Sequence, residues 1–70
     1  MTGHEVLIAQ IMRAMEVEQP YAPNELAGML MIRGANYAEA GDILSELALE
    51  PGIYMQGGYF HRAKSLLGGA

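Results

Sequence analysis

The chain has 70 residues, a net charge of −4, no cysteine and 51% apolar residues. This length allows at most one small domain, and without cysteine neither a disulfide nor a thiolate metal site can stabilise it. No apolar run reaches membrane-spanning length and residues 1–20 lack the pattern of a signal peptide, so we expect a cytoplasmic protein outside the membrane.

A first helix is predicted from the N-terminal residues to about Glu18. Thr2 and Glu5 have the spacing of a capping box. Apolar residues then recur in steps of three and four, which is typical of one helix face: Leu7, Ile8, Ile11, Met12 and Met15. The helix should end before Pro20, because the residue before a proline disfavours helical geometry.

A second helix should open at Pro23, since proline is favoured at the first helical position. Gly34 has the place of a C-terminal stop. The segment between them is apolar almost all round, and one helix face cannot bury all of it. We therefore predict a homodimer through Met31, Ile32 or the outer side of the first helix. The alternative is a few singly exposed apolar residues, which are common.

Asn36 and Glu39 predict the start of a third helix, again with capping-box spacing. Its apolar stripe consists of Ala40, Ile43, Leu44 and Leu47. Its opposite face is an acidic stripe formed by Glu39, Asp42 and Glu46. Pro51-Gly52 should end this helix.

Gly57-Gly58 predicts a two-residue hairpin turn in which both glycines have positive φ. This turn sets Gln56 opposite Tyr59, Met55 opposite Phe60 and Tyr54 opposite His61. The inner face should then hold Ile53, Met55 and Phe60, and the outer face Tyr54, Gln56, Tyr59 and His61. We expect a last helical turn over 63–67, which makes 1–67 a single domain and 68–70 a frayed tail.

The expected fold class is therefore mainly α with a small β-hairpin, three helices and a C-terminal two-stranded wing. The predicted core is Leu7, Ile11, Leu26, Leu30, Leu44, Leu47, Ile53 and Phe60. This order resembles the winged helix-turn-helix family, through ELA at 25–27, ILSEL at 43–47, and GGYFHRA at 57–63. The resemblance implies a helix-turn-helix, with the third helix as recognition helix and the hairpin as wing.

The resemblance also implies DNA binding, but the charge distribution argues against it. Residues 1–50 hold all eight acids and two of the four bases, so they sum to −6, whereas residues 51–70 sum to +2. Carboxylates of the acidic stripe would oppose phosphate. Candidate nucleic-acid contacts are therefore on the wing: Tyr54, Tyr59, His61, Arg62 and Lys64.

No enzymatic site emerges from the sequence. Two histidines do not form a zinc-ligand spacing, His61 has no evident catalytic partner, and Gly57-Gly58 lacks the lysine of a phosphate loop. We therefore expect no catalytic residue, metal, cofactor or small-molecule substrate.

Two functions remain open. The first is a protein-interaction module, an adaptor or small inhibitor, that acts through Glu39, Asp42 and Glu46. The second is a DNA-binding transcriptional regulator that contacts DNA mainly through its wing.

Overall fold

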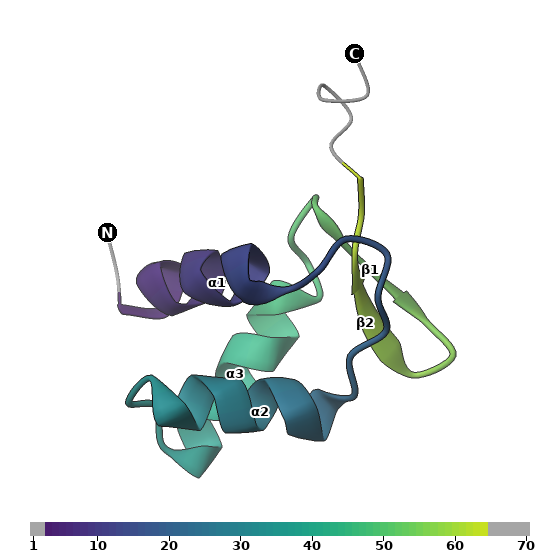
Figure 1. Cartoon of the computed structure of the whole chain (residues 1–70). Helices are drawn as coiled ribbons and strands as arrows, with labels where there is room; N and C mark the ends of the chain where they lie inside the picture. Colours follow the sequence, from purple (N-terminus) through teal and green to yellow (C-terminus); the bar gives the residue numbers. More distant parts are fainter. Residues whose placement is uncertain (1–2, 65–70) are drawn as a thin grey trace.

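The computed structural model describes residues 3–64. In chain order it contains α1 (Gly3–Ala14), α2 (Pro23–Ile32), α3 (Tyr37–Leu47), β1 (Ile53–Gln56) and β2 (Tyr59–Arg62). The three helices pack together, and the hairpin stands at one end of the helical body (Figure 1). This confirms the predicted class, mainly helical with a small C-terminal hairpin, and it fits a winged-helix-like architecture.

The helix boundaries of α2 and α3 follow from local hydrogen bonds. Asn36 Oδ1 accepts from the Glu39 N–H at 2.8 Å, and Glu39 Oε1 accepts from the Asn36 N–H at 3.0 Å, which confirms the capping box. Gly34 has φ +106°, its N–H donates to the Met31 carbonyl, and the next N–H donates to Leu30. The predicted stop is thus a Schellman motif, which requires the left-handed conformation that glycine adopts easily.

The prediction for the end of α1 was wrong by several residues, because α1 ends at Ala14 and not near Glu18. The chain leaves the helix to reach the hairpin. Tyr21 and Phe60 each donate their N–H to the other's carbonyl at 2.9 Å, and the Glu18 N–H donates to the Arg62 carbonyl at 2.8 Å. Pairing with β2 therefore competes with helix continuation, and the α1–α2 connection lies along β2 as a third, short extended segment.

The predicted hairpin register is confirmed. Tyr54 pairs with His61, Met55 with Phe60 and Gln56 with Tyr59. Gly57 and Gly58 have φ of +61° and +83°, as a primed two-residue turn requires.

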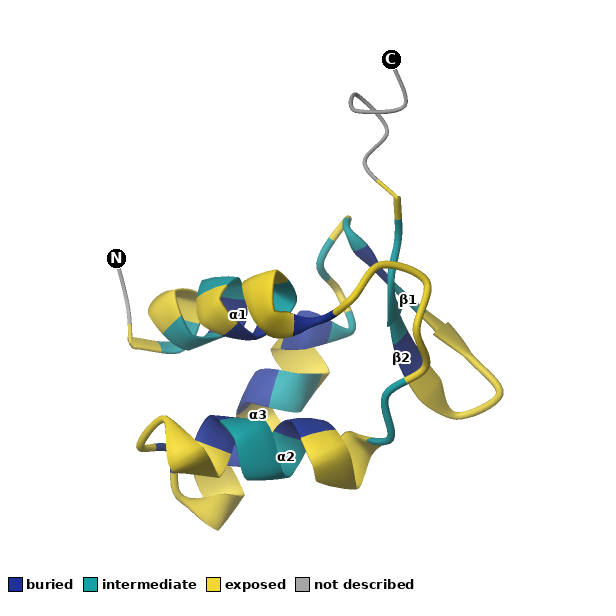
Figure 2. Cartoon of the chain, viewed as in Figure 1, coloured by how far each residue is buried: buried dark blue, intermediate teal, exposed yellow. Residues whose placement is uncertain are grey.

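The prediction that Met55 closes the core was wrong, because 45% of this residue is exposed. Ile53 and Phe60, on the same face, are buried. The tip of the hairpin projects past the helices, so the outer half of its inner face has nothing to pack against (Figure 2).

One buried cluster joins the three helices and the base of the hairpin: Ile8, Ile11, Met15, Leu26, Leu30, Ala35, Ala40, Ile43, Leu47, Ile53 and Phe60. Leu7 and Leu44, which we also expected in the core, are partly buried and pack against it.

Some expectations fall at the chain ends. The Thr2 cap, residues 65–67 of the expected last turn and the tail 68–70 lie outside the described residues. Ala63 and Lys64 follow β2 without helical structure, so the part of that turn that is described is not helical.

Candidate functional site

The acidic stripe of α3 is exposed to solvent along its whole length. Glu39, Asp42 and Glu46 are all exposed, and α3 contains no lysine or arginine. Glu39 is partly engaged in the capping box of its own helix. The structure therefore presents, along α3, a surface that favours cations.

Glu46 is linked to α1 through His4. His4 Nδ1 lies 2.7 Å from Glu46 Oε2. This hydrogen bond raises the pKa of the His4 imidazole above its ordinary value, against a smaller opposing effect of desolvation, and the charges of Glu46, Glu39 and Asp42 raise it further. Protonated His4 thus neutralises one charge at the end of the stripe.

Side chains on the outer face of the hairpin contact one another and the α1–α2 connection. The Tyr54 and His61 rings stack with centroids 4.8 Å apart and an interplanar angle of 7°. The Tyr54 hydroxyl donates to Glu18 Oε2 at 2.8 Å, and this bond raises the pKa of the Tyr54 phenol, with desolvation and the Glu18 charge acting in the same direction. Side chains from three neighbouring segments therefore form one row across this face.

Glu18 was not found by the sequence reasoning. Its φ of +66° is the left-handed conformation, which costs a non-glycine residue free energy. Its N–H bond to Arg62 and its bond to Tyr54 hold it there. The signal in the sequence was the turn-forming Gln19-Pro20, but this dipeptide does not indicate which strand the turn meets.

The five candidate nucleic-acid contacts are divided by the structure. The Tyr54 and His61 rings stack on each other, and Arg62 Nη1 donates to the carbonyl of Met15, the residue after α1, at 3.0 Å. Tyr59 and Lys64 are exposed. The wing thus leaves fewer groups available for phosphate or bases than its sequence suggests, and the Glu18 carboxylate of the α1–α2 connection lies against Tyr54.

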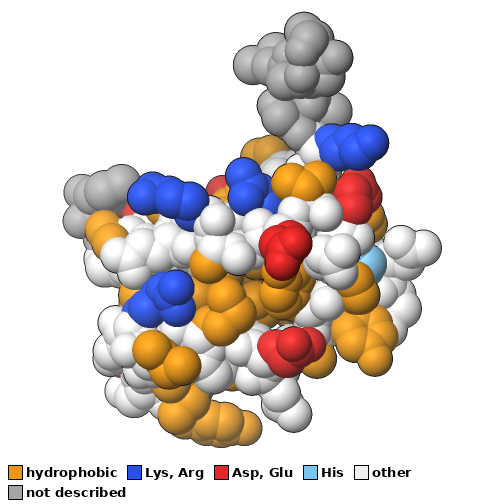
Figure 3. Space-filling model, in the orientation of Figure 1, with side chains coloured by type: hydrophobic (Ala, Val, Ile, Leu, Met, Phe, Trp, Pro, Cys, Tyr) orange, Lys and Arg blue, Asp and Glu red, His pale blue; other side chains and the backbone are white. Residues whose placement is uncertain are grey.

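The predicted dimer residues lie at the end of α2. Ile32 is 84% exposed and Met31 is also exposed. Figure 3 shows hydrophobic side chains gathered over the α2–α3 turn, at the lower left. These two residues are therefore accessible, as a dimer contact requires.

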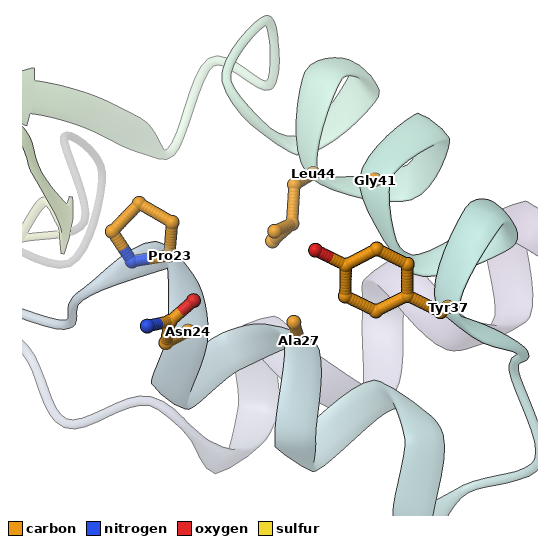
Figure 4. A pocket seen from close by; sticks show the side chains of 6 residues that line it. All are labelled: Pro23, Asn24, Ala27, Tyr37, Gly41 and Leu44. Carbon is orange, nitrogen blue, oxygen red and sulfur yellow. The ribbon is translucent and has the colours of Figure 1, made fainter.

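A groove of about 200 Å³ lies between α2 and α3. Its lining consists of Pro23, Asn24, Ala27, Tyr37, Gly41 and Leu44 (Figure 4). The Tyr37 ring extends from α3 across the space, and Leu44 points into it. In the sequence, Gly41 inside the amphipathic third helix was the one indication of this groove. The sequence analysis did not use it.

A second, shallower hollow of about 360 Å³ is lined by Gln10, Arg13, Ala14 and Arg33. Figure 3 shows basic side chains on this face. Arg13 lies in the last turn of α1, and Arg33 Nη1 donates to the Met29 carbonyl at 3.0 Å. Both arginines thus stabilise the negative carbonyl ends of helices, which accounts for their positions.

The described part of the chain offers no constellation for metal chemistry. Within residues 3–64, no group of three or more His, Cys, Asp or Glu side chains could hold a metal ion. In the same residues, every helix is too short or too polar to cross a bilayer. Comparison with protein-family models, with curated proteins and with solved structures gives no match.

Proposed function

We propose that this chain is a non-enzymatic, winged-helix-like interaction module that binds a protein partner through α3, as an adaptor or inhibitor. The observation that carries this proposal is the exposed acidic stripe of Glu39, Asp42 and Glu46 on a helix with no basic residue. Complementary charge steers association and selects partners. The expected partner surface is therefore basic.

The same observation disfavours duplex DNA as the partner of α3. Affinity for DNA comes largely from lysine and arginine side chains that displace counterions from phosphate. A carboxylate next to a phosphate has the opposite effect. The engaged Tyr54–His61 pair and the neighbouring Glu18 carboxylate further weaken the case for the wing.

DNA binding through the wing remains the second candidate function, because Tyr59 and Lys64 are exposed near the hairpin. Under this alternative, replacing Lys64 by alanine weakens binding to all duplex sequences alike and reduces its salt dependence.

Two measurements separate the candidates. The first is a mobility-shift titration with random duplex DNA at low salt, where phosphate contacts are strongest. The second is cross-linking in source lysate of the wild type and of the triple variant Glu39→Gln, Asp42→Asn, Glu46→Gln. A control variant neutralises two carboxylates outside α3, Glu16 and Glu50.

The interaction module predicts no DNA shift and cross-linked products that the triple variant loses and the control retains. A DNA shift that Lys64→Ala reduces would reject the module in favour of the regulator. Products that both neutralised variants retain equally would reject α3 as the contact surface.

A further inference from the structure

We propose that the hollow between α1 and the end of α2 binds a phosphate group with two negative charges, either free or carried by a small molecule. The hollow is lined by Gln10, Arg13 and Ala14 of α1 and by Arg33, which follows α2. None of these residues belongs to α3, so the site goes beyond the proposed function and does not depend on the acidic stripe.

Both arginines have N–H groups to offer to a ligand. Arg13 makes no hydrogen bond or ion pair within residues 3–64, and Arg33 uses Nη1 for the Met29 carbonyl. In the same residues no carboxylate pairs with either guanidinium, although the chain has eight acids and only four bases. Gln10 adds an exposed side-chain amide, which donates through two N–H groups. The lining thus combines donors from three side chains with no negative charge.

Stabilisation of helix ends explains each arginine separately but not the hollow that they share. A basic residue near a helix C-terminus stabilises that helix by itself. It gains nothing from a second guanidinium on the same hollow, because two positive charges repel each other. Arg62, which donates to the carbonyl of Met15 directly after α1, brings a third guanidinium to this end of the helix. An anion in the hollow would replace this repulsion by attraction (Figure 3).

The charge and the size of the hollow favour phosphate among anions. Two guanidiniums match a phosphate monoester, which carries about −1.5 to −2 at pH 7. A carboxylate or a phosphodiester has a single charge and would leave one guanidinium uncompensated. The planar guanidinium fork also binds phosphate oxygens through paired N–H groups. The volume of about 360 Å³ lies within the range of roughly 300–1,000 Å³ for small-ligand pockets, so it accommodates phosphate with a small attached group.

Amide chemical-shift titration of the full chain tests the site, at constant ionic strength and above the second phosphate pKa of about 6. The ligands are phenyl phosphate, inorganic phosphate, dimethyl phosphate and acetate. We expect the first two to shift the amides of the four lining residues saturably. Dimethyl phosphate and acetate, each with one charge, should bind at least about tenfold more weakly. Tighter binding of phenyl phosphate assigns the site to a small phosphate monoester, and equal binding of the two phosphates assigns it to the free ion.

Arg13→Gln and Lys64→Gln are matched variants. Each removes one exposed positive charge, and neither side chain makes a hydrogen bond or ion pair within residues 3–64. Lys64 does not line the hollow, so Lys64→Gln should leave phosphate binding within about twofold, whereas Arg13→Gln should weaken it at least about tenfold. Arg13→Lys keeps the charge but loses the planar fork, so it should bind phosphate less tightly than the wild type. Thermal unfolding verifies that all three variants fold cooperatively.

Four results would each overturn the proposal. The first is the absence of saturable shifts with both phosphates. The second is equal weakening by Arg13→Gln and Lys64→Gln, which would indicate a diffuse effect of net charge. The third is acetate that binds as tightly as phenyl phosphate, which would make the ligand a carboxylate. The fourth is random duplex DNA that shifts the same amides and displaces phenyl phosphate, which would make the ligand a nucleic-acid backbone.

Discussion

Tyr21 and Phe60 exchange two backbone hydrogen bonds of 2.9 Å, and this pairing joins the α1–α2 connection to the hairpin. An isolated two-stranded hairpin is marginally stable in water. Here β2 has β1 on one side and the connection on the other, and the Phe60 side chain is buried in the helical core. The wing is thus fixed to the body by backbone as well as by side-chain contacts.

The core assignment predicts that truncating two leucines of α3 to alanine lowers the free energy of unfolding by different amounts. Leu47 is fully buried, so Leu47→Ala should reduce the free energy of unfolding by about 2–5 kcal/mol. Leu44 lines the groove and is partly buried, so Leu44→Ala should cost less. Denaturant unfolding measures both, with the exposed Leu49→Ala as control. Equal costs for all three would contradict the assignment.

Replacement by alanine should have opposite effects on stability at two glycines, one in the hairpin turn and one inside α3. Gly58 has φ +83°, where a side chain costs about 1–2 kcal/mol, so Gly58→Ala should destabilise the fold. Gly41 lies inside α3 with open space around it, so Gly41→Ala should stabilise by up to about 1 kcal/mol. Thermal unfolding compares the two variants. A stabilising Gly58→Ala would show that the turn is not of the primed type.

The His4–Glu46 contact predicts a pH dependence of stability. Because the pKa of His4 is raised in the fold, its contribution is fully present below the unfolded value of about 6.5. It is lost as the pH rises through the higher folded value. The melting temperature should therefore contain a component that falls as the pH rises above about 6.5.

His4→Gln, which cannot titrate, should lack this component. Glu46→Gln, which removes the hydrogen-bonded carboxylate but leaves Glu39 and Asp42, should reduce it. The pH dependence of the NMR chemical shifts of the His4 ring gives its pKa directly, and His61 is a second imidazole in the same sample. A pH profile of the His4→Gln variant that matches that of the wild type would reject the contribution.

The predicted homodimer can be tested directly, because the end of α2 is exposed. If Met31 and Ile32 form the contact, sedimentation at high micromolar concentration should show a dimer that Ile32→Asp converts to monomer, since a charge cannot be buried there unpaired. Leu49→Asp, which changes an equally exposed leucine elsewhere, is the control. A monomeric wild type at that concentration would reject the dimer.

Local sequence determined the starts of α2 and α3, the stop at Gly34 and the hairpin. Each depends on contacts between residues a few positions apart: Asn36 with Glu39, the left-handed Gly34, and the paired positive φ of Gly57 and Gly58. The period of the apolar residues determined which helix faces are buried. These features need no knowledge of distant chain segments, so the amino-acid order alone predicts them.

Tertiary structure decided what happens where distant segments meet. It ended α1 at Ala14, because the following residues pair with β2, and it exposed Met55, because the hairpin extends beyond the helices. It also joined Glu18 to Tyr54, His4 to Glu46, and Gly41 to the groove between α2 and α3. The acidic stripe was readable from helical spacing, whereas its ion pair with His4 and the groove between α2 and α3 depend on how α1 and α2 pack against α3, which no local pattern specifies.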